Sequence, residues 1–236
     1  MLLVVLAAAV SRAGGLGHDR AVVVATVRAV VQLGAVAAVL VAVLGSAALT
    51  AFFVIAMTLV ASATAGRRLV RRRTAAWAVL PVGLGALPVV GLLLALRVVP
   101  LQGIAVVPVA GILIGGAMTA TVLAGRRALD ELGARRGEVE AGLAIGLQPR
   151  DAALLVCGPA AGQALVPSLD TTRTVGLVVL PGTFVGTLLG GATPVEAGAV
   201  QVLVLVALLA VQAVAVVITI GLVAGGRFRQ VDADLT

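Results

Sequence analysis

Six long apolar runs, separated by short arginine-bearing segments, determine what this chain can fold into. Crossing about 30 Å of hydrocarbon takes roughly 20 apolar residues as an α-helix, and only helices or closed barrels satisfy every backbone group there. The runs are continuous rather than alternating, which favours helices. Spans are expected at 29–44, 48–65, 75–96, 103–124, 173–190 and 197–225, with a short seventh candidate at 1–11. The sequence predicts an all-α, polytopic integral membrane protein with six to seven transmembrane helices.

The basic residues support one alternating topology. All 17 are arginines, and 16 of them fall in the loops 12–28, 66–74 and 125–173 or in the tail from 226. Because loops rich in arginine stay on the cytoplasmic side, we expect these segments and the C-terminus to be cytoplasmic. The chain is therefore expected in the plasma (inner) membrane. Its net charge of +7 needs no nucleic acid, because anionic lipid headgroups attract it equally well.

The same topology assigns the region after residue 124. If both 152–169 and 173–190 crossed the membrane, the arginines of the tail would lie outside, so 149–170 is expected to be a cytoplasmic or interfacial helix. The chain then reads as one transmembrane permease domain, 1–236, with a cytoplasmic loop at 125–172. The segment 1–11 is interpreted as a truncated first transmembrane helix, with a signal peptide as the alternative.

Several chemistries lack the residues that they require. A single cysteine, Cys157, excludes an intrachain disulfide and a thiolate metal cluster, and the single histidine, His18, is expected to be a solvated loop residue rather than a metal ligand. The chain has no G-x-x-x-x-G-K-[ST] motif. We expect no cofactor in this chain and ATP bound by a partner subunit.

Small and polar residues inside the runs suggest packing seams and a pathway. Glycines four apart at 111/115, 182/186/190 and 221/225 are expected to let helices approach closely. Pro108 and Pro181 are expected inside helices, where each frees a carbonyl that could bind a cation, or simply forms a packing kink. No charged residue is expected at bilayer depth. The candidates for the translocation path are Gln32, Pro108, Met118, Pro181, Gly182, Thr183 and Gln201. The polar side chains among them could equally be interhelical hydrogen-bond partners, and Glu196 is assigned to a capping box with Thr193.

The stretch 138–159 is polar and interrupted by a turn. Glu140-Ala141-Gly142, then Gly146 and Val156-Cys157-Gly158-Pro159, follow the spacing of the E-A-A motif of ABC-transporter permeases, which this stretch resembles. Gly146 is expected to end one helix in a left-handed turn, and Pro149 to begin the next. Candidate ATPase-coupling residues are Glu138, Glu140, Ala141, Leu143, Gly146 and Leu147, with Ile145 adding apolar surface. The alternative is an ordinary amphipathic interfacial helix.

A closer resemblance extends over residues 20–228. Its matches are Arg28-Ala29-Val30-Val31-Gln32-Leu33, Pro108-Val109-Ala110-Gly111, Gly116-Ala117-Met118, Pro167-Ser168-Leu169-Asp170, Thr174-Val175-Gly176-Leu177-Val178, Leu180-Pro181-Gly182 and Gln201. The chain thereby resembles the FetB/YbbM family of ABC permeases. That resemblance implies a homodimeric permease working with a separate, FetA-like ATPase, iron export in bacteria and aluminium tolerance in plants. This chain departs from the family pattern at Ile112, Gly116, Thr183 and Phe184.

The expected function is a permease subunit that exports iron or another metal cation. The alternative within transport is a non-metal substrate such as an amino acid or a nucleotide sugar, against which the 2% aromatic content argues. A membrane enzyme would need an acid, a base or a metal set inside the membrane. A passive assembly protein would have no ATPase partner.

Overall fold

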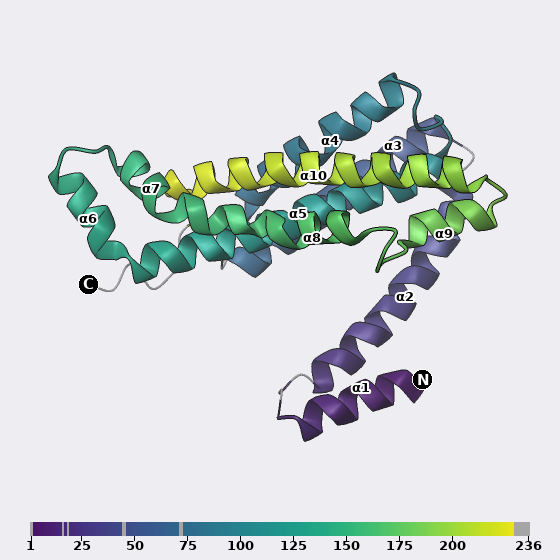
Figure 1. Cartoon of the computed structure of the whole chain (residues 1–236), viewed down its shortest axis with the longest axis horizontal. Helices are drawn as coiled ribbons and strands as arrows, with labels where there is room; N and C mark the ends of the chain where they lie inside the picture. Colours follow the sequence, from purple (N-terminus) through teal and green to yellow (C-terminus); the bar gives the residue numbers. More distant parts are fainter. Residues whose placement is uncertain (1, 16, 18, 44–45, 71–72, 229–236) are drawn as a thin grey trace. The chain divides into compact units, whose positions relative to one another are not determined.

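The computed structural model describes residues 2–15, 17, 19–43, 46–70 and 73–228, which form helices and short connections (Figure 1). Six helical segments are long and apolar enough to cross a membrane: Asp19–Ala38, Ala47–Leu69, Thr74–Ala95, Gly103–Ala134, Pro149–Thr174 and Pro194–Ala224. In these described ranges the extended structure is limited to a single bridge between Val175 and Val179. The all-α, polytopic class expected from the sequence is confirmed.

The chain divides into two units, Met1–Thr50 and Ala51–Thr236. In the first, α1 (Leu2–Ala13) packs beside α2 (Asp19–Val43), and Gln32 is exposed on α2. Of these two helices, α2 is long enough to span a membrane and α1 is too short. His18 lies outside the described residues. Helix α3 (Ala47–Leu69) begins at the end of this unit and continues into the second.

The second unit is a bundle around two long helices. Helix α10 (Pro194–Ala224) packs against α5 (Gly103–Ala134) and α4 (Val79–Ala95), which follows the 3₁₀ helix η1 (Arg73–Ala78). Alanine and valine fill the interior, and Ala110, Ala117 and Val211 are fully buried. Without a hydrophobic driving force between helices in lipid, close packing of such small residues is what holds a bundle together.

The close approaches between helices follow the expected glycine seams only in part. A Cβ at Gly111 would lie 3.2 Å from the Cε atom of Met57 in α3, whereas one at Gly182, Gly186 or Gly221 would meet nothing within 4 Å in this chain. Helices touch elsewhere. A Cβ on Gly85 would lie 3.1 Å from the carbonyl oxygen of Val211, and one on Gly116 would overlap Leu208. The spacing of glycines in sequence does not say which helix face meets a neighbour.

The fifth span lies earlier than the sequence indicated. Helices α7 (Pro149–Gly162) and α8 (Val166–Thr174), joined by the 3₁₀ turn η2 (Gln163–Leu165), form a run of 26 residues that is apolar enough to span. The segment 149–170 therefore has the properties of a span rather than of a surface helix. The expected span at 173–190 is wrong, because that region holds a loop and the eight-residue α9 (Gly182–Leu189). One span replaces the other, and the number of six is unchanged.

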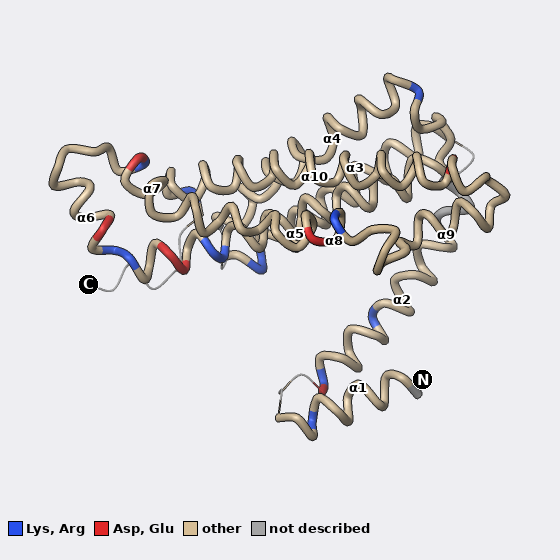
Figure 2. The backbone as a smooth tube through the Cα atoms, in the orientation of Figure 1, with Lys and Arg blue, Asp and Glu red and all other residues tan. Residues whose placement is uncertain are grey.

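Arginines gather at one end of the second unit (Figure 2). The Arg126 guanidinium donates two hydrogen bonds, of 3.2 and 3.1 Å, to the carbonyl oxygen of Arg68 and so joins the ends of α5 and α3. Arg227, just beyond α10, stacks over the ring of Trp77 in η1 at 4.8 Å. The following Phe228 is buried. The end of α10 is thereby attached to the connection between α3 and α4.

Candidate functional site

The α6–α7 hairpin projects from the arginine-rich end of the bundle (Figure 1). Helix α6 (Arg136–Ala144) ends in a Schellman motif: the amide of Gly146 donates to the Leu143 carbonyl, and the amide of Leu147 donates to the Gly142 carbonyl, each at 3.0 Å. Gly146 has a φ of 93°, a left-handed conformation that glycine adopts without steric cost. Pro149 then begins α7. The helix–turn–helix expected at these residues is confirmed.

The two glutamates proposed for coupling are held by arginines of the same segment. Arg136 bonds Glu140 at 3.0 Å, and Arg135 bonds both Glu131 at 3.0 Å and Glu138 through two nitrogens. The hydrogen bond and positive charge of Arg135 lower the pKa of Glu138 below its ordinary value, and the same contacts raise the pKa of Arg135. All these side chains are substantially exposed, so they shape the surface charge of α6 rather than its stability.

The hairpin presents apolar side chains to the outside. Ile145 is 81% exposed and Leu143 is 42% exposed, while Ala141 is also open. Leu147 instead turns back onto Gly142, since its Cδ1 would lie 3.4 Å from a Cβ placed there. Of the three apolar residues predicted to offer a docking surface, Leu143 and Ile145 are therefore the exposed ones. Leu147 fixes the turn.

A break in the helical structure, residues 175–181, separates α8 from α9. The Thr174 carbonyl accepts the amides of Leu177, Val178 and Val179 at 3.0 to 3.4 Å, and Gly176, with a φ of 84°, bonds the Val179 carbonyl at 2.9 Å. Pro181 is the N-cap of α9 and lies outside any helix interior, so the expectation that it kinks a helix is wrong. Its missing amide is compatible with a helix start and would interrupt a continuous helix.

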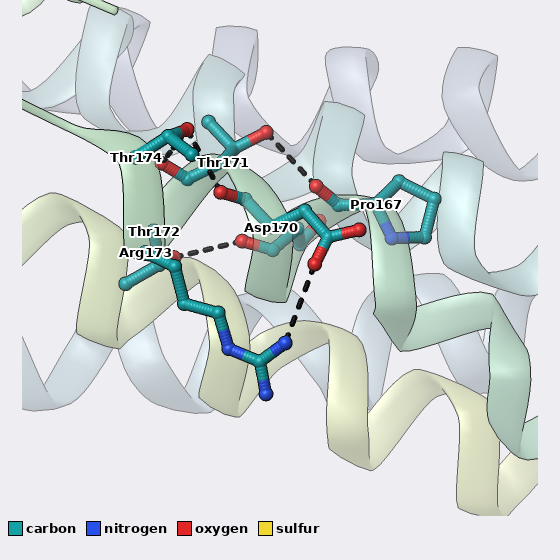
Figure 3. A network of polar contacts seen from close by, with 7 residues as sticks. Pro167, Asp170, Thr171, Thr172, Arg173 and Thr174 are labelled. Carbon is teal, nitrogen blue, oxygen red and sulfur yellow. Dashed lines mark hydrogen bonds and ion pairs between the residues drawn. The ribbon is translucent and has the colours of Figure 1, made fainter. Parts of the chain in front are cut away.

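Helix α8 carries a dense set of polar groups just before this break (Figure 3). Asp170 pairs with Arg173 at 3.4 Å. The hydroxyls of Thr171, Thr172 and Thr174 donate to carbonyls one turn earlier at 2.8 to 2.9 Å. Both charged residues lie among the last five residues of the Pro149–Thr174 run, which is long and apolar enough to span a membrane. Ionisable residues in such spans are rare and mark substrate or ion pathways.

The other predicted path residues lie on several elements. Gln32 belongs to the first unit, and Pro108 lies inside α5 on an exposed face. Met118 is half-buried against the core, and Gln201 is buried in α10. Gly182 and Thr183 form the first turn of α9 and do border the break. Asp170 and Arg173 were not among the predicted site residues, because the fifth span was expected at 173–190, although the hydropathy of 149–174 is itself sufficient to indicate a span.

Two buried amides stand out on α10. Gln201 and Gln212 are each 5% exposed, and their Oε1 atoms find no hydrogen-bond partner among the described residues. Within the same ranges, no three His, Cys, Asp or Glu side chains lie close enough to hold a metal ion.

Six helical segments that are apolar and long enough to cross a membrane define a multi-pass α-helical membrane protein. The chain belongs to the uncharacterised protein family UPF0014, whose model matches residues 1–228. The family membership expected from the sequence is confirmed.

Named relatives span most of the chain. The UPF0014 membrane protein STAR2 of Oryza sativa subsp. japonica is 35% identical over 209 residues, 86% of this chain and 72% of the relative. The UPF0014 membrane protein YjkA of Bacillus subtilis is 30% identical over 224 residues, covering 92% and 88%. The probable iron export permease protein FetB of Escherichia coli is 29% identical over 228 residues, covering 92% and 85%. No solved structure matches the chain.

Proposed function

We propose that this protein is the permease subunit of an ABC transporter and exports iron or another metal cation, while a separate cytoplasmic ATPase binds and hydrolyses ATP. The observation that carries the proposal is the α6–α7 hairpin, whose short helix exposes Leu143 and Ile145 beyond the bundle. A relative that is 29% identical over 92% of this chain is named a probable iron export permease, which supports the substrate class.

The arginine-rich end is the cytoplasmic end in this proposal, and it includes the hairpin and the residues that follow α10. Arginine retained on the cytoplasmic side supports this orientation. Two permease chains and two FetA-like ATPase chains form the working complex. Each ATPase contacts the α6 of one permease through Leu143 and Ile145, and the charges of Glu138 and Glu140 border that contact.

Movement passes from α6 into the membrane through covalent and packed connections. Gly142 of α6 lies against Ala152 of α7, and a Cβ at Gly142 would stand 3.1 Å from the Ala152 methyl. Helix α7 continues through η2 into α8, which ends at the break. ATP-driven displacement of α6 therefore tilts α7–α8 and changes the loop 175–181. The two resulting states expose the break to opposite sides of the membrane.

The end of α8, beside the break, supplies the groups that a transported cation needs. The Asp170 carboxylate and the neighbouring threonine oxygens are hard ligands, and one carboxylate with neutral oxygens binds weakly enough to release its cargo. Arg173 competes for the same carboxylate at 3.4 Å, so cation entry requires that this pair open. The pair also favours a second candidate, a zwitterionic substrate such as an amino acid, because it offers one charge of each sign.

Transport by the reconstituted complex tests the proposal. The chain is co-expressed with its ATPase, placed in proteoliposomes and assayed for ATP-dependent movement of iron against manganese, zinc and a no-metal control. The proposal expects metal flux that is lost in Asp170→Asn and retained in Asp151→Asn, a control at the opposite end of the α7–α8 span. ATP-dependent flux of an amino acid without any metal flux would replace the first candidate with the second.

A further inference from the structure

A groove lies between α3 and the η1–α4 connection at the arginine-rich end of the bundle. Leu59, Ser62 and Ala63 of α3 form one wall, and Ala75, Ala76 and Val79 form the other. Its volume is about 540 Å³. Arg67 lines the groove one turn beyond Ala63 and is its only charged lining residue, so the cavity is apolar along its length and cationic at one end.

Small residues explain why the groove is open. At Gly66 the two walls touch, because a Cβ there would overlap the Ala75 carbonyl group, 2.8 Å from its carbon atom. One turn further into the span, Ala63 and Ala76 offer only methyl groups and are exposed, so nothing from either wall fills the space. Ser62 adds no free donor, since its hydroxyl already bonds the Thr58 carbonyl at 2.7 Å.

Arg67 in the groove, its neighbour Arg68 and Arg126, which contacts Arg68, have no anionic partner within the described ranges. The ion pairs of those ranges join Arg135, Arg136 and Arg173 to acids. Arg126 instead donates to a neutral carbonyl, that of Arg68. An occupant that complements this site has an anionic head for the arginines and an apolar body for the alanine-lined groove.

We infer that the groove is a binding site for an anionic phospholipid, with one acyl chain between α3 and η1 and the phosphate on Arg67. Basic pockets between transmembrane helices at the cytoplasmic surface are a known way to hold such headgroups. The inference does not depend on what the protein transports. A bound lipid here covers the point where α3 meets η1 and ties the connection between two spans to the surrounding leaflet.

Lipid binding to the purified full-length protein tests this inference. Native mass spectrometry is used to compare phosphatidylglycerol with phosphatidylcholine of the same acyl chains, and inorganic phosphate is a third ligand. We expect a clear preference for phosphatidylglycerol over phosphatidylcholine and no saturable binding of phosphate. Arg67→Gln is expected to weaken phosphatidylglycerol binding by roughly fivefold or more.

Matched variants separate the groove from the charge. Ala63→Leu fills the cavity without touching a charge and is expected to abolish the lipid preference, whereas Ala51→Leu, exposed on the same helix, leaves it unchanged. Arg150→Gln, exposed at the start of α7, controls for loss of one positive charge. Equal binding of the two lipids, or phosphate binding as tight as that of phosphatidylglycerol, overturns the inference. A change of oligomeric state in Ala63→Leu with lipid binding intact does so too, because it marks the groove as a protein contact.

Discussion

Gly142 of α6 and Ala152 of α7 lie so close that an added Cβ at Gly142 would stand 3.1 Å from the Ala152 methyl group. This contact joins the exposed hairpin to the helix that leads into the membrane. Because α6 has no buried residues of its own, its position depends on this contact, on the turn at Gly146 and on the surface ion pairs. The contact is where a force on α6 would enter the bundle.

Substitution of Gly142 tests how α6 is held. Gly142→Val is expected to push α6 away from α7, and Gly137→Val is the control, since a Cβ at Gly137 meets nothing within 4 Å. Both changes have the same effect on intrinsic helix propensity. Hydrogen exchange measured by mass spectrometry should therefore show faster exchange of the α6 amides in the first variant only. Equal exchange in the two variants would mean that α6 does not depend on the contact.

The pairing of Glu138 with Arg135 predicts a pH dependence for α6. The pairing lowers the folded-state pKa of Glu138 below its unfolded value of about 4.3, so its contribution is fully present above that pH and is lost as the pH falls through the folded value. Carbon-13 titration of labelled glutamate should give Glu138 a midpoint below the ordinary glutamate value of about 4.3. Arg135→Gln should raise that midpoint, and an unchanged midpoint would contradict the pairing.

The approach of α3 to η1 predicts which glycines tolerate a methyl group. Gly66→Ala forces a Cβ into the backbone of Ala75 and should destabilise the protein by roughly 1–3 kcal/mol, the usual range for overpacking. Gly115→Ala lies inside α5 with open space around it and should be neutral or slightly stabilising. Thermal unfolding in detergent distinguishes the two. A Gly66→Ala protein that melts with the wild type would show that this contact is absent.

A strained residue follows α4. Arg97 has a φ of 54° at the position of a Schellman motif that glycine normally occupies, with its amide bonded to the Leu94 carbonyl at 3.0 Å. Arg97→Gly should relieve the strain and stabilise the protein by about 1 kcal/mol. Leu96→Gly, at a residue with a φ of −76°, gains no such relief and should destabilise. Thermal unfolding of the pair checks the prediction, and the opposite order would refute it.

Much of the fold was predictable because hydropathy and local turn chemistry act over short stretches. The spans near 48–65, 75–96, 103–124 and 197–225, the turn at Gly146 and the capping box of Thr193 and Glu196 all depend on residues close in sequence. Such signals need no knowledge of what packs against the helix. The first span begins at Asp19, ten residues earlier than expected, and replaces most of the loop expected at 12–28.

The fifth span and the glycine contacts were not predictable in the same way. The positions of the arginines allow only one crossing between residues 149 and 190, and they do not say which of the two apolar runs makes it. The helix is broken between Gly176 and Pro181, inside a run of apolar residues. Hydropathy alone could not predict this break, because it takes no account of backbone conformation. The contacts of Gly66 and Gly85 depend on which helices are neighbours, which a single sequence does not specify.

The most direct test of the account is ATP-driven metal flux in proteoliposomes that contain the permease and its ATPase, measured for Ile145→Ser and Val195→Ser. Both side chains are 81% exposed, so neither change should disturb the core, but only Ile145 lies on the α6–α7 hairpin. The account predicts that Ile145→Ser greatly reduces ATP-dependent flux and ATPase association, while Val195→Ser behaves as the wild type. Undiminished flux and association in Ile145→Ser would contradict the assignment of this hairpin as the contact with the ATPase.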